Sequence, residues 1–100
     1  MSLDPLRYVD LQLEVLKQLA RNNDRFLDSI PNDSRYSGMR QAATQIRQQD
    51  RGTFEMAERN VRDALDRERG HLQPGDDRRS QAIEDRYQQL EEYRRRFYGG

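Results

Sequence analysis

The sequence predicts an all-α fold, an antiparallel three-helix bundle in which a long central helix packs against a helix on either side. Apolar residues recur at steps of three and four along residues 5–29, 34–69 and 78–97. The short runs between these segments are rich in Pro, Gly, Asn and Asp, which favour turns and antiparallel neighbours. A coiled-coil-like helical hairpin with an added third helix is the alternative arrangement. Either way residues 1–100 form one domain, with residues 99–100 as a flexible tail.

The composition limits the core to a small apolar seam. Charged residues make up 36% of the chain and hydrophobic residues 33%, and 18 basic residues balance 18 acidic ones. Such a polar chain folds when its apolar residues share one helical stripe. The absence of cysteine excludes disulfides and thiolate metal sites. No apolar run is long enough to span a membrane, and the first residues do not resemble a signal peptide, so we expect a soluble cytoplasmic protein.

The first helix is expected from Pro5 to about Ser29. Asp4 before Pro5 is a helix start, since proline at the first helical position loses no hydrogen bond and the aspartate can cap free amides. Pro31 disfavours helical geometry at Ile30. The apolar seam, with one polar member, is Leu6, Val9, Leu13, Leu16, Ala20, Asn23, Leu27 and Ile30.

A second apolar stripe lies on the far side of this first helix. It consists of Tyr8, Leu11 and Val15, which we call the outer stripe. A two-helix hairpin would leave the outer stripe exposed, whereas a third helix or a second chain would cover it. These three residues are therefore the candidate partner-binding residues.

The long central segment has an interrupted seam. Its apolar positions are Tyr36, Met39, Ala43, Ile46, Thr53, Phe54, Ala57, Val61, Ala64 and Leu65. No apolar residue follows Ile46 at the next step, and Gly52 costs about 1 kcal/mol relative to alanine in a helix interior. A kink near Asp50 to Gly52 is thus an alternative to the continuous helix that we expect, because glycine alone seldom breaks a helix whose flanks keep the pattern.

The two halves of the central segment differ in charge. The second half is braced by acid-before-base pairs four residues apart, which are Glu55 with Arg59, Glu58 with Arg62, and Asp63 with Arg67. Residues 34–49 contain arginine and glutamine but no acidic residue. On a helix Arg40, Arg47 and Arg51 share one face, which could follow a phosphate backbone. Nucleic-acid binding through these arginines is an alternative function, and a solvated or protein-facing helix surface is the other reading of the same residues.

The third helix is expected over residues 78–97, capped by Asp76 or Asp77. Its apolar side is narrow and aromatic, comprising Ile83, Tyr87, Leu90 and Phe97 with Tyr93 beside them.

The sequence offers little chemistry. Glu68 and His71 have the Glu-x-x-His spacing of di-iron bundles, but those sites need several carboxylate-bearing helices. A single histidine and no cysteine exclude a hydrolytic triad or a zinc site within one chain. We expect no enzyme, cofactor, metal or membrane partner. The sequence instead indicates a protein–protein interaction module, an adaptor, scaffold or chaperone-like subunit that forms a homodimer or joins an assembly.

Overall fold

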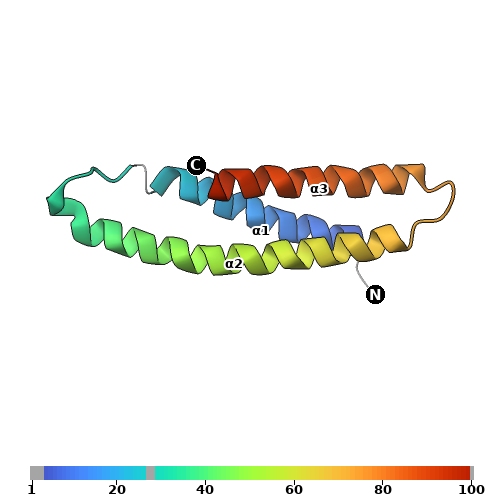
Figure 1. The fold of residues 1–100 in the computed structure, drawn as a ribbon, viewed down its shortest axis with the longest axis horizontal. Helices are drawn as coiled ribbons and strands as arrows, with labels where there is room; N and C mark the ends of the chain where they lie inside the picture. The colour runs from blue at the N-terminus through green and yellow to red at the C-terminus, as the bar shows by residue number, and fades with distance from the viewer. Residues whose placement is uncertain (1–3, 27–28, 100) are drawn as a thin grey trace.

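The computed structural model describes residues 4–26 and 29–99, apart from the side chains of residues 23–26. It confirms the all-α, three-helix fold (Figure 1). The helices are α1 (Pro5–Phe26), α2 (Ser37–Gly70) and α3 (Asp77–Tyr98), with a short 3-10 turn η1 (Ser34–Tyr36) before α2. No strand occurs in the described ranges. The seam positions Asn23 and Leu27 lie outside the described side chains.

Salt bridges between the helices show in which direction each helix runs relative to the others. Asp4, just before α1, binds Arg79 of α3 (3.6 Å), and Asp10 of α1 binds Arg86 of α3 (2.8 Å), so α1 and α3 run in parallel. Arg62 and Arg69 of α2 bind Glu91 and Glu84 of α3 respectively, so α2 runs antiparallel to α3. The chain is therefore an up-down-up bundle.

Helix ends follow local capping chemistry. The Leu6 amide donates to Asp4 Oδ1 (2.9 Å), which confirms the expected start of α1. Asp33 accepts from the Arg35 amide (3.0 Å) and opens η1, so the α-helix proper begins at Ser37, three residues later than the sequence predicted. α1 is described as far as Phe26, and Ser29 lies in a turn, so its expected end at Ser29 is too late. α3 begins and ends one residue outside its predicted range.

The central helix is continuous. α2 runs without interruption from Ser37 to Gly70, through the Asp50 to Gly52 stretch where a kink was the alternative. Gly52 is exposed, and a side chain there would meet nothing within 4 Å. The glycine thus weakens the helix locally, while the flanking turns keep α2 helical through this stretch.

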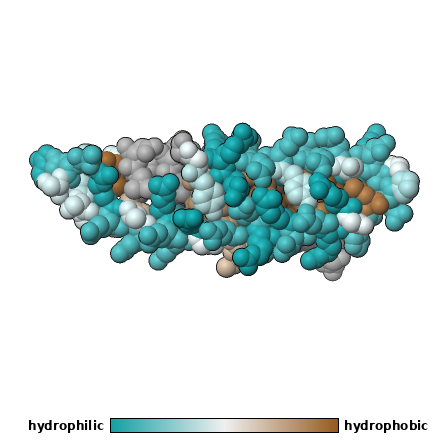
Figure 2. Space-filling view, viewed as in Figure 1, coloured by the Kyte–Doolittle hydropathy of each residue, from teal (hydrophilic) through white to brown (hydrophobic). Residues whose placement is uncertain are grey.

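The core occupies only the part of the bundle where all three helices overlap. The largest fully buried side chains are Phe54, Leu16, Leu65, Ile83, Leu90, Val9 and Val61. Figure 2 shows a mostly hydrophilic face, with hydrophobic colour confined to narrow patches. No helix of the described chain is long and apolar enough to cross a membrane.

The seam predicted for the first half of α2 is buried only at Ala43. Met39 is 54% exposed and Ile46 is 50% exposed. The physical reason is helix length: the Phe97 ring near the end of α3 stacks on Phe54 with centroids 4.2 Å apart, so α3 stops beside the middle of α2. Figure 1 shows the green half of α2 extending well beyond the red end of α3.

Candidate protein-binding surfaces

The outer stripe is exposed in the folded chain. Tyr8, Leu11 and Val15 are 38%, 49% and 41% exposed, whereas the seam residues from Leu6 to Ala20 are buried. Both α2 and α3 pack on the seam side of α1, and neither covers the opposite side. The third helix that the sequence left as one possible cover therefore does not provide it.

A groove with both apolar and charged lining borders one edge of the outer stripe. Tyr8 lines this groove between α1 and α2, together with Pro5, Asn60, Asp63, Ala64, Arg67 and Glu68. A partner lying on the stripe would thus meet an apolar centre and, at the Tyr8 end, both acidic and basic side chains. That composition is typical of interfaces, whose cores are apolar and whose rims are polar.

The three arginines proposed from the sequence lie in α2 as expected, but their surroundings differ. Arg40 donates to the neutral amide oxygen of Asn32 (2.5 Å). Arg51 forms a salt bridge with Glu55 (3.4 Å), and Arg47 is exposed with no partner among the described residues. Arg51 is therefore partly neutralised, while Arg40 and Arg47 pair with no carboxylate among the side chains that the structure describes.

An aromatic cluster at the end of α3 was not predicted as a site. The ring of Tyr98 packs edge-on against Phe54 and Phe97, with centroids 5.5 and 5.0 Å apart. The guanidinium groups of Arg51 and Arg94 lie 5.6 and 5.7 Å from the Tyr98 ring centre. The Phe97-Tyr98 doublet was the available sequence signal, but its contacts depend on which turn of α2 faces it.

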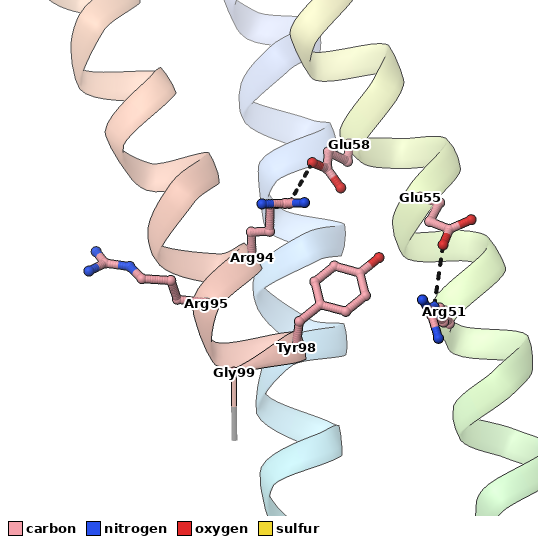
Figure 3. Close-up of a pocket in the computed structure, with 7 residues that line it drawn as sticks. All are labelled: Arg51, Glu55, Glu58, Arg94, Arg95, Tyr98 and Gly99. Carbon is pink, nitrogen blue, oxygen red and sulfur yellow. Dashed lines mark hydrogen bonds and ion pairs between the residues drawn. The ribbon is translucent and has the colours of Figure 1, made fainter.

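Arg51, Arg94 and Tyr98 line a surface pocket where α3 ends (Figure 3). Glu55 and Glu58 line it from α2, and Arg94 binds Glu58 (3.1 Å). Burial raises the pKa of the Tyr98 hydroxyl, and the charge of Glu55 raises it further. The pocket thus mixes both charge signs around one tyrosine.

A second tyrosine is held between α2 and α3. The Tyr87 hydroxyl donates to Asp66, and the Arg69 guanidinium lies 4.4 Å from the centre of the Tyr87 ring. The pKa of Tyr87 rises from 10.0 to about 12, first because burial disfavours the phenolate and then because Asp66 holds the hydroxyl hydrogen.

This raised pKa predicts a loss of stability at alkaline pH. The folded protein keeps Tyr87 protonated to a higher pH than the unfolded chain does, so the stabilising contribution is complete below about pH 10 and is lost as the pH rises towards about 12. Urea unfolding at about pH 9 and about pH 11.5 should show a smaller drop for Tyr87→Phe than for the unmodified protein. The exposed Tyr8→Phe variant is the control and should keep the original drop. Equal drops for the unmodified protein and Tyr87→Phe would contradict the assignment.

The described residues contain no group of three His, Cys, Asp or Glu side chains placed to hold a metal ion. Glu68, the first residue of the Glu-x-x-His spacing, binds Arg79 (2.8 Å) and is engaged in joining α2 to α3.

The fold places the chain among small all-α proteins of three helices. No family model, curated protein or solved structure matches it. The exposed surfaces themselves therefore have to carry any proposal about function.

Proposed function

We propose that this chain is a non-enzymatic helical protein–protein interaction module whose docking face is the outer stripe of α1. The observation that carries the proposal is the exposure of Tyr8, Leu11 and Val15 on a helix whose opposite side buries Leu6, Val9, Leu13 and Leu16. The first occupant to test is a second copy of the chain, because most soluble oligomers are homo-oligomers. A different helical protein is the second. An adaptor, scaffold or chaperone-like role in the cytoplasm fits such a module.

The size of the stripe sets the strength of binding. Covering the remaining exposed area of three such side chains contributes on the order of 2 to 4 kcal/mol. Association costs at least about 4 kcal/mol in lost translational and rotational freedom. The stripe is therefore the centre of a larger contact that includes polar neighbours, and the resulting complex should dissociate at low concentration.

Replacing Leu11 and Val15 by serine tests the proposal. Sedimentation equilibrium at several concentrations should show a mass that rises with concentration for the unmodified protein. The Leu11→Ser/Val15→Ser variant should weaken that association at least about tenfold, about 1.4 kcal/mol, while its helical circular dichroism is unchanged because both positions are exposed. Met56→Ser, at a side chain 66% exposed on α2, is the matched control.

Two outcomes would count against this role. A collapse of helicity in the double-serine variant would show that the stripe belongs to the core. If the protein stays monomeric, a photo-crosslinking residue at position 11 should capture a protein that the same residue at position 56 does not capture. A monomer with no adduct specific to position 11 would sink the proposal.

A further inference from the structure

The α2–α3 contact contains a repeated arginine–glutamate arrangement. Arg62 and Arg69 lie seven residues apart on α2, and they bind Glu91 and Glu84, which lie seven residues apart on α3. The shortest distances are 2.8 and 2.5 Å. Seven residues are nearly two helical turns, so each pair of side chains projects from one side of its helix. This side of α2 therefore accepts an antiparallel helix that carries carboxylates at a seven-residue spacing.

The same spacing recurs in the first half of α2. Arg40 and Arg47 lie seven residues apart, each 22 positions before Arg62 and Arg69 respectively. At 3.6 residues per turn, 22 residues are about six turns plus about 40°, so all four arginines lie on one side of α2. We call Arg40 and Arg47 the free arginine pair. Opposite them α3 has already ended, at Tyr98.

No carboxylate of the described chain occupies the position that α3 would have filled. Among the described side chains, the hydrogen-bond partner of Arg40 is the neutral Asn32 amide, and Arg47 has none. Residues 34–49 contain no acidic residue at all. The open stretch of α2, residues 37–50, is about 20 Å long at about 1.5 Å per residue, which matches a helix of about four turns.

Apolar side chains border this basic stretch. Met39 and Ile46 project from α2 roughly a quarter to a third of a turn away from the free arginine pair and are half exposed. A ligand that covers both features needs carboxylates along one edge and apolar side chains beside them. An amphipathic helix has that distribution.

We propose that the first half of α2 binds an acidic amphipathic helix of a partner protein, lying in line with α3 and antiparallel to α2. Two of its carboxylates, seven residues apart, pair with Arg40 and Arg47, as Glu91 and Glu84 pair with Arg62 and Arg69. Its apolar edge covers Met39 and Ile46. This surface is separate from the outer stripe of α1 and does not depend on it.

The alternatives fit less well. The same half of a second copy would bring arginines against arginines, and like charges across an interface are costly. A phosphate backbone following the free arginine pair towards Arg51 would reach Glu55 and Glu58, which line the pocket beside it (Figure 3). Those carboxylates would repel phosphate. They also already form salt bridges with Arg51 and Arg94 respectively.

The test uses the full chain and two designed helical peptides of about 20 residues. One carries glutamates seven residues apart beside a leucine edge, and the other carries lysines at the same positions. By fluorescence anisotropy the glutamate peptide should bind and the lysine peptide should not. Arg40→Glu/Arg47→Glu should weaken glutamate-peptide binding at least about tenfold and should acquire binding to the lysine peptide. Arg59→Glu/Arg78→Glu, at exposed helix positions away from the free arginine pair, changes the net charge equally and should bind as the unmodified protein does.

The remaining outcomes decide against the proposal. Equal binding of both peptides, or loss of binding in the control variant, would show non-specific charge attraction. A DNA or RNA duplex that binds more tightly than the glutamate peptide and is released by Arg40→Glu/Arg47→Glu would assign the surface to nucleic acid. Loss of self-association in that variant would assign it to a second copy. The Leu11→Ser/Val15→Ser variant should bind the glutamate peptide normally, so failure of one proposal leaves the other intact.

Discussion

Phe54→Ala should lower the free energy of unfolding by about 3 to 5 kcal/mol, the range for truncating a buried phenylalanine. Phe54 is fully buried, and its ring stacks on Phe97 and meets Tyr98 edge-on. It is also the last buried residue of α2 before the stretch that α3 does not cover. The variant therefore loses apolar burial, leaves a cavity and releases the end of α3.

A loss of this size is a large part of the stability that a 100-residue domain has, which is about 5 to 15 kcal/mol. Thermal and urea unfolding followed by circular dichroism should show a much lower midpoint, or no cooperative transition. Phe54→Leu keeps most of the volume and should cost less than the alanine variant. A Phe54→Ala midpoint within a few degrees of the original would show that α3 does not end against Phe54.

The local parts of this fold were predictable from the sequence because their causes are local. The Asp4-Pro5 start, the turn chemistry around Pro31 and Pro74, and the steps of three and four each act within a few residues. They predicted three helices in the right order, with the start of α1 correct and both ends of α2 and α3 off by one to three residues. The exception was η1, where Asp33 accepts a hydrogen bond from the Arg35 amide and α2 begins three residues later than predicted.

The relative placement of the helices was not predictable in the same way. No local signal states that Phe97 meets Phe54, and that contact decides that Ile46 is exposed although its spacing is that of a seam residue. The ion pairs show the same limit. Glu58 binds Arg62 as the spacing predicted (3.2 Å), but Glu55 binds Arg51 instead of Arg59. Each carboxylate has several arginines within reach on its own and neighbouring helices, so spacing along one helix does not decide the partner.

The residues of the candidate surfaces were predictable from the sequence, but the contacts around them were not. The far-side spacing of Leu11 and Val15 was enough to place them away from the core. The sequence also grouped Arg40 with Arg47 and Arg51. Only the assembled bundle shows that Arg51 already has Glu55, and that Arg40 and Arg47 continue the side of α2 that binds carboxylates of α3.

Gly52→Pro and Gly52→Ala should change stability in opposite directions. Proline in a helix interior removes a backbone hydrogen bond and clashes with the preceding turn, at a cost of about 3 kcal/mol or more. Alanine restricts the unfolded chain and favours the helix by about 1 kcal/mol, and an added side chain would meet nothing within 4 Å. The expected shifts in melting temperature are a rise of about 4 to 8 °C for alanine and a fall at least twice as large for proline.

The proline variant should also separate the two halves of α2. The first half has only Ala43 buried, so it should lose its helical signal before the three-helix part melts, giving a broad early phase in the melting curve. Gly38→Ala, at an equally open position in the first turn, is the matched control and should raise stability less, because helix ends fray. Tolerance of proline together with no gain from alanine would mean that α2 bends at Gly52. A bend would aim Arg40 and Arg47 away from the line of α3, and the acidic helix proposed for that surface would then have to approach from another direction.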